Sequence, residues 1–183
     1  MTDQSDGLEA HPDLGAAGAS MREKWRAEQE AAMKDAVESR AHRLTLQDRF
    51  REHMHRGDRI AVTVAGQRIA GVPEEIGADL LAVRTLFARV DIHLSPTIPF
   101  SYELVEKPLQ GGHRGSDSAG GTFHGALLAR EQDEQATIGT IFDADGIDGK
   151  LVVGTDHVVI VARSGKETTL PIAQVSWVAP TRQ

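Results

Sequence analysis

The chain of 183 residues contains no cysteine. Disulfide bonds, thiolate metal sites and cysteine nucleophiles are therefore excluded, which agrees with a reducing compartment. The sequence also lacks an apolar run long enough for a membrane-spanning helix, and its N-terminus lacks a charged-then-apolar signal pattern. These absences predict a cytoplasmic protein. Aromatic residues make up 4% of the chain, which is few for a surface that stacks nucleic-acid bases.

An excess of basic residues is also absent, since the formal net charge is −7. Residues 1–39 carry four Lys or Arg and nine Asp or Glu, so the N-terminal region holds most of the negative charge. The remainder is nearly neutral, and a strong electrostatic footprint for nucleic acid is not expected. The composition, 40% hydrophobic and 26% charged, is typical of a globular protein.

The N-terminal region divides into a tail and a helix. Residues 1–19 are small, polar and acidic, and they predict a disordered tail. Ser20 and Glu23 match a capping box, which predicts a helix over residues 20–44. An apolar stripe on this helix packs either on its own domain or on another chain. The residues that we assign to a candidate partner face are Trp25, Met33, Val37 and Leu44.

A further capped helix begins at Thr45 and ends at Gly57. The sequence leaves open whether residues 20–56 form one helix or two. After Gly57 the apolar residues alternate, which predicts five strands up to residue 106. Residues 107–121 are glycine-rich and predict a linker. A short helix capped by Thr122 follows, and five more strands are expected after it, within residues 136–180.

The two strand regions repeat one pattern. An Ile-x-Gly element occurs at Ile69–Gly71 and again at Ile147–Gly149. A Gly-x-Asp element before an apolar strand occurs at Gly77–Asp79 and again at Gly154–Asp156. Each copy has a capped helix in front and a segment of proline and apolar residues at its end. We therefore interpret the chain as one unit of about 60 residues used twice. The repeated aspartates are expected to bind backbone in turns.

Within this repeat, the "DADG" of residues 143–146 occupies the turn between the first and second strands of the second copy. Asp and Gly suit such a turn, because Gly adopts positive φ and Asp bonds nearby backbone. A calcium loop of the EF-hand type would need an oxygen ligand where Ile147 stands and a glycine where Asp148 stands. The turn is the favoured interpretation.

The order of helix, strand, glycine-containing turn, Ile-x-Gly, Gly-x-Asp and final strand resembles the Sm-like small-barrel family. A PRC-type barrel is a near competitor, because "IGTIFDADGIDGKLVV" would suit it as well. The resemblance implies an α+β, mainly β fold: a long N-terminal helix, then two Sm-like or SH3-like small antiparallel β-barrels, each preceded by a helix. The first barrel would occupy residues 45–106 and the second residues 122–183. RNA binding and oligomeric assembly are also implied by the resemblance.

Six basic residues are the candidate nucleic-acid contacts. Arg49, Arg51, Arg56 and Arg59 cluster where the second helix enters the first strand region, and Arg163 and Lys166 belong to the "RSGKE" turn. Acidic residues lie between the clustered arginines, so a solvated, ion-paired face is the alternative to a phosphate-binding patch.

No sequence motif points to catalysis. The histidines lack metal-ligand spacing, and neither a nucleophile elbow nor a phosphate-binding loop is present. The prediction is a protein that is not an enzyme and carries no cofactor and no metal. We expect a protein-interaction, scaffold or regulatory module that binds a protein partner or itself, with no membrane contact. The alternative is an RNA-binding or single-stranded nucleic-acid-binding protein of Sm-like type.

Overall fold

A computed structural model describes residues 12–108, 121–133, 135–143 and 145–181. The chain divides into two units, residues 1–45 and residues 46–183. The first unit contains one helix, α1 (Pro12–Arg43). This helix begins eight residues before the expected start at Ser20, so residues 12–19, which were expected in the disordered tail, are helical. Residues 1–11 of that tail lie outside the described residues.

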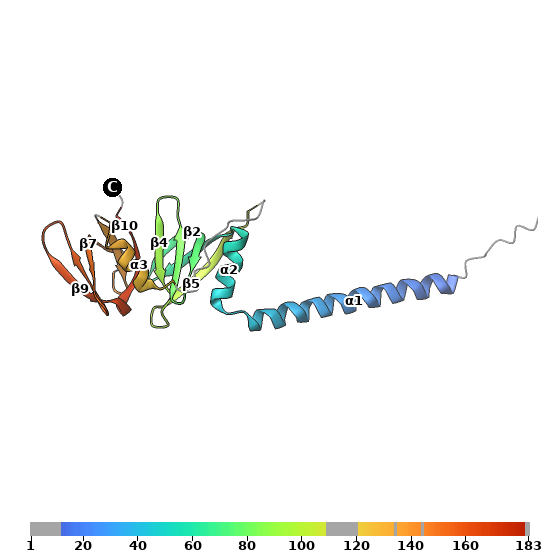
Figure 1. Cartoon of the computed structure of the whole chain (residues 1–183). Coiled ribbons are helices and arrows are strands. Elements are labelled where there is room, and N and C mark those ends of the chain that lie inside the picture. The colour runs from blue at the N-terminus through green and yellow to red at the C-terminus, as the bar shows by residue number, and fades with distance from the viewer. Residues whose placement is uncertain (1–11, 109–120, 134, 144, 182–183) are drawn as a thin grey trace, which may run out of the picture. The chain divides into compact units, whose positions relative to one another are not determined.

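Among its described residues, the second unit holds two further helices and ten strands, whose arrangement is drawn in Figure 1. A separate helix, α2, follows α1, so residues 20–56 form two helices rather than one. The first half of the second unit consists of α2 (Leu46–Arg56), β1 (Arg59–Val64), β2 (Gln67–Ile76), β3 (Leu80–Arg84), β4 (Arg89–His93) and β5 (Phe100–Glu106). Its second half consists of α3 (Phe123–Arg130), β6 (Ala136–Thr140), β7 (Ile147–Val153), β8 (His157–Val161), β9 (Glu167–Pro171), a short 3-10 turn (Ile172–Gln174) and β10 (Val175–Pro180).

Every strand expected from the alternating pattern is confirmed. The turn chemistry is confirmed as well: Thr122 caps α3 by accepting the Gly125 N–H at 3.1 Å. In the turn from β6 to β7, the Asp143 carboxylate accepts the Asp145 N–H at 3.0 Å, and Gly146 has a φ of 87°. The glycine-rich linker expected at residues 107–121 falls mostly on residues 109–120, which lie outside the described residues.

The expectation of two closed small barrels is wrong. The strands form one open antiparallel sheet in the order β5-β1-β2-β3-β4-β10-β6-β7-β8-β9. Closure of each half would require its last strand to meet its fourth strand. Instead, the free edge of β4 binds β10 from the other half, through the pairs Trp177–Ile92 and Val178–Asp91. The hydrogen-bonding groups at that edge are therefore satisfied between the halves rather than within one half.

Two strands bend the sheet because each changes its partner midway. Residues Gln67–Gly71 of β2 pair with β1, and residues Val72–Ile76 of the same strand pair with β3. In the second half, Ile147–Gly149 of β7 pair with β6, and Lys150–Val153 pair with β8. The Ile-x-Gly elements of the repeat therefore mark the two bends of the sheet.

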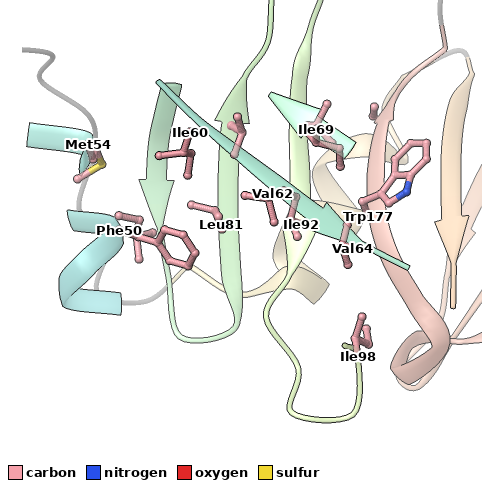
Figure 2. Packing of buried hydrophobic residues seen from close by; sticks show 14 residues of the cluster. Phe50, Met54, Ile60, Val62, Val64, Ile69, Leu81, Ile92, Ile98 and Trp177 are labelled. Atoms are coloured by element: carbon pink, nitrogen blue, oxygen red, sulfur yellow. The ribbon is translucent and has the colours of Figure 1, made fainter. Parts of the chain in front are cut away.

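Two apolar clusters form the core, one in each half. The first gathers side chains of α2 and of β1 to β4, and the second gathers side chains of α3 and of β6 to β8. Each cluster also includes side chains from the other half: Trp177 and Ala179 of β10 belong to the first cluster, and Leu80 of β3 belongs to the second. Figure 2 shows Trp177 at the end of the first cluster, with Val64 and Ile69 nearby. The two halves therefore fold as one body.

Candidate interaction surface

The junction between the halves is fixed by a buried carboxylate. Asp91 of β4 is 2% exposed and lies between two arginines. Arg89 Nε donates to it at 2.7 Å from β4, and Arg130 Nη2 donates to it at 3.0 Å from α3. Arg89 also binds Glu75 at 2.7 Å. A buried carboxylate needs such partners, because its desolvation is otherwise costly.

These charged groups line a cavity of about 520 Å³ between α3 and the sheet. Burial lowers the pKa of the Arg89 guanidinium, but hydrogen bonds and charges from Asp91 and Glu75 outweigh burial and raise that pKa above its ordinary value. Arg89 therefore stays charged at any physiological pH. Because the acidic and basic groups here bind one another, their arrangement favours a structural role.

A second set of contacts links α3 to the first half. The Asp79 carboxylate accepts the Phe123 N–H at 2.8 Å and so binds a free donor at the start of α3. His93, at the end of β4, stacks on the Phe123 ring with 4.4 Å between ring centres. Its Nδ1 donates to the Val175 carbonyl at 3.0 Å. Of the two repeated aspartates, Asp79 thus binds backbone, but of a distant helix rather than of its own turn. Asp156 instead accepts a hydrogen bond from the His157 Nδ1 at 2.9 Å.

The two halves repeat each other in hydrogen bonding as well as in strand order. The Gln47 amide of α2 donates to the Gly77 carbonyl at 3.2 Å, and His124 Nε2 of α3 bonds to the Gly154 carbonyl at 2.9 Å. Both side chains are the second residue of their helix, and both carbonyls belong to the Gly-x-Asp element. Each helix is therefore held to the same turn of its own half.

The two ends of the sheet are open. Among the described residues, β5 pairs with β1 alone and β9 pairs with β8 alone. These strands lie at opposite ends of the sheet in Figure 1. Leu104 and Val105 of β5 are 39% and 45% exposed. An edge strand presents unpaired N–H and C=O groups, which is the arrangement that a strand of another chain can bind.

The four clustered arginine candidates do not form a free basic patch. Arg49 lies 3.9 Å from Glu52, and Arg51 lies 3.1 Å from Asp48. Arg56 contacts both Glu52 and the buried Asp58. Arg59 lines a separate groove of about 500 Å³ whose lining also includes Trp177. These ion pairs reduce the positive charge available to a phosphate.

The other two basic candidates lie elsewhere. Arg163 and Lys166 lie in the turn between β8 and β9, at the opposite end of the sheet from α2. Arg163 Nε donates to the Gln135 side chain at 3.0 Å. The structure therefore does not bring the six basic residues together into one site.

The candidate partner face of α1 is exposed. Trp25, Met33 and Val37 are 67%, 71% and 63% exposed, and Met21, which precedes them on the helix, is also exposed. Leu44 follows the end of α1 and is half-buried. This face stays a predicted partner surface.

The pairing of the buried Asp91 with the partly buried Arg130 was missed by sequence reasoning, and so was the role of Trp177. Asp91 could have been suspected, because it interrupts the apolar strand "VDIHLS" and a buried carboxylate requires a partner. Nothing local identifies Arg130 as that partner, since the two residues lie 39 positions apart.

Within the described ranges, no three histidine, aspartate or glutamate side chains lie close enough to hold a metal ion. No described helix is long and apolar enough to cross a membrane. No protein-family model, curated protein or solved structure matches the chain. The resemblance to the Sm-like family therefore stays a prediction.

Proposed function

We propose that the protein is a non-catalytic interaction module whose open sheet edges bind strands of partner protein chains. The observation that carries this proposal is that β5 and β9 each pair on one side alone among the described residues. A partner strand would gain main-chain hydrogen bonds at either edge, and this mode of binding needs no preformed pocket.

The character of β5 supports this proposal. Proteins commonly protect an edge strand by making it short, charged or interrupted by proline. β5 is seven residues long and contains no proline, and two of its apolar side chains, Leu104 and Val105, are exposed. It carries two carboxylates, of which Glu103 is ion-paired with Arg68 of β2 at 2.6 Å, and its pairing with β1 is irregular at Val105. The regularly paired part of the strand, Phe100–Leu104, is therefore poorly protected against pairing with another chain.

The charged cavity supports the non-catalytic part of the proposal. A catalytic group needs an accessible proton or lone pair beside the substrate. Around the 520 Å³ cavity, Asp91 accepts hydrogen bonds from Arg89 and from Arg130, and Glu75 accepts one from Arg89; the contact of Arg130 with Asp91 links α3 to β4. The chemistry of these side chains is therefore used in joining the halves.

The alternative of RNA binding has weaker support. Arg49, Arg51 and Arg56 of α2 are ion-paired, and the whole chain is acidic. Binding to phosphates would have to break or share those pairs.

Light scattering coupled to size-exclusion chromatography would test the proposal. We expect the molar mass of the wild-type chain to rise with concentration, and Val105→Lys to abolish that rise because it places a charge at the β5 edge. Val152→Lys is the matched control: Val152 is 48% exposed on β7, which is an interior strand of the sheet. A molar mass that both variants lower equally would contradict binding at the edge.

Filter retention of RNA at two salt concentrations would test the alternative. Salt-sensitive retention that is lost in the Arg49→Ala, Arg51→Ala and Arg56→Ala triple variant would favour RNA binding. No retention at low salt is the result expected from the interaction proposal.

A further inference from the structure

We propose that the groove beside Trp177 binds a short extended peptide segment of a partner protein, which adds as a strand to the free side of β2. The groove has a volume of about 500 Å³ and is the one that Arg59 lines. This inference goes beyond the proposed function, because that function concerns the two outer edges of the sheet and this groove lies between its halves.

The first half of β2 has backbone groups that no other strand uses. Val64 and Gln67 flank the two-residue turn of the β1–β2 hairpin, so they form a hydrogen-bonded pair of the ladder. Such pairs alternate with non-hydrogen-bonded ones, so Arg68 and Ala70 direct their N–H and C=O groups away from β1. Among the described residues, neither of them pairs with a strand on that side. A partner strand can therefore bind there through main-chain hydrogen bonds.

The free side of β2 faces the groove. Val72, two residues after Ala70, lies on the same side of the strand and pairs with Arg84 of β3. The tip of the β3–β4 hairpin extends beyond this pair, but the first half of β2 does not follow it, because it pairs with β1 instead. A gap is left between the hairpin tip and this part of β2, and both line the groove.

The tip of the β3–β4 hairpin forms the opposite wall. Its backbone is held by Thr85, whose hydroxyl donates to the Ala88 carbonyl at 2.8 Å and accepts the Phe87 N–H at 3.2 Å. Leu86 and Phe87 are 80% and 75% exposed, although both side chains are large and apolar. Both residues line the groove. A segment bound in the groove would cover this apolar surface.

The floor of the groove is the open end of the first core cluster. Ile69, Val90 and Trp177 belong to that cluster and are nearly buried, yet each of them lines the groove. Figure 2 shows Ile69 close to Trp177 at one end of the cluster. In an extended segment, alternate side chains point to the same face. Apolar residues at alternate positions of the partner segment would therefore extend the core.

The rims of the groove carry opposite charges. Arg59 and Arg68 lie on the side of β1 and β2, and Asp145 and Asp148 lie on the side of the β6–β7 turn and β7. Arg68 is ion-paired with Glu103, whereas Arg59 makes no ion pair with a described residue. The segment that fits carries an acidic side chain toward Arg59 and a basic side chain toward the two aspartates. These aspartates disfavour a phosphate backbone in the same groove.

Tryptophan fluorescence tests the site with peptides as probes. In a Trp25→Phe chain, Trp177 is the only tryptophan, and its emission reports on the groove. The probes are the end-blocked hexapeptides Glu-Val-Thr-Val-Thr-Lys and Lys-Val-Thr-Val-Thr-Glu, which allow for both strand directions. A control peptide has serine in place of both valines. We expect a saturable change of emission with at least one probe at millimolar concentration, and none with the control peptide.

A pair of matched variants locates the bound peptide, and both are made in the Trp25→Phe chain. Phe87→Ala should weaken binding about tenfold, because it removes apolar surface that the peptide covers. Phe142→Ala is the control. Phe142 is 76% exposed but does not line the groove, so its loss should leave binding unchanged.

The backbone contact and the charged rim have separate variants. Ala70→Pro removes an N–H that points away from β1, so the β1–β2 ladder is kept and binding should weaken about fivefold. Arg59→Glu should reverse the charge preference, so that this variant binds a probe whose glutamate is replaced by lysine better than the original probe. Such a reversal keeps the test decisive if Ala70→Pro fails to fold.

Each outcome has one meaning. Saturable binding that Phe87→Ala weakens and Phe142→Ala leaves unchanged supports the groove. No saturable change with either probe, or an equal change with the control peptide, overturns the inference. Binding that Val105→Lys abolishes and Phe87→Ala leaves unchanged places the peptide at the β5 edge, which overturns this inference and leaves the proposed function intact. Binding in the groove without any association at β5 or β9 contradicts the proposed function alone.

Discussion

Gly71 and Gly149 lie where β2 and β7 change their pairing partners. A Cβ atom built on Gly71 would lie 2.1 Å from the Arg84 carbonyl oxygen, and one on Gly149 would lie 2.7 Å from the Val161 carbonyl oxygen. Both oxygens belong to the neighbouring strand and cannot move without breaking the ladder. The repeated glycine is therefore required by the close approach of two strands at each bend.

Gly71→Ala should lower the free energy of unfolding by about 3 kcal/mol or more, because the backbone itself must shift. Urea unfolding followed by circular dichroism would measure the loss. Gly165→Ala is the control. Gly165 has a φ of 80°, and no atom lies within 4 Å of the added Cβ, so the free energy of unfolding should fall by about 1 kcal/mol. Equal losses in the two variants would show that close approach is not the constraint at Gly71.

Ala65 has a φ of 48°, and Gly66, which follows it in the turn between β1 and β2, has a φ of 83°. Two positive φ values describe a type I′ hairpin turn, in which asparagine is favoured before glycine. Ala65→Asn should raise the free energy of unfolding by about 0.5–1 kcal/mol. Urea unfolding would measure this gain in stability. Ala129→Asn, at an exposed position of α3, is the control, and it should lower the free energy of unfolding by about 0.5 kcal/mol. A loss of stability at Ala65 would contradict the turn assignment.

At the scale of elements, α3 is tied to β4 through Asp91. Asp91→Asn should lower the free energy of unfolding by about 3 kcal/mol, because it leaves Arg89 and Arg130 partly buried without their shared carboxylate. Thermal or urea unfolding would measure this. Asp133→Asn removes a more exposed partner of Arg130, 3.3 Å away, and should cost at most about 1 kcal/mol. Similar small losses in both variants would show that the junction does not depend on Asp91.

The exposure of α1 can be measured by tryptophan fluorescence. The chain contains two tryptophans, and one of them, Trp25, lies on α1. Trp25 on α1 is 67% exposed, and Trp177 in the first core cluster is 7% exposed. Iodide should therefore quench the fluorescence of a Trp177→Phe variant strongly and that of a Trp25→Phe variant weakly. Weak quenching of Trp25 at high protein concentration, but not at low concentration, would show that a second chain covers the predicted partner face. Weak quenching at every concentration would contradict the exposed position of Trp25.

At the scale of the whole molecule, the sequence predicts elements better than their pairing. Alternating apolar residues identify all ten strands, and Thr122 and Gly57 correctly mark helix ends, because these features depend on neighbours in the chain. The junction of β4 with β10 depends on residues more than 80 positions apart, such as Ile92 and Trp177. A local pattern cannot tell whether an edge closes on its own half or on the other one, and the closed barrels were wrong for that reason.

The same distinction explains the candidate sites. The ion pairs of Arg49, Arg51 and Arg56 with residues three or four positions away could be anticipated, and the sequence supported that alternative. The contact of Asp79 with Phe123 could not, because a repeated aspartate indicates a turn but not which distant helix lies against it. The strand order of the structure identifies β5 and β9 as the edge strands.

The most direct test of the account is amide hydrogen exchange at low and high protein concentration, read by mass spectrometry over β5 and β9. Binding of other chains at the open edges predicts that β5 or β9 gains protection as concentration rises, while the interior strands β3 and β7 stay unchanged. Edge strands that exchange at the same rate at both concentrations would contradict association of chains at the open edges.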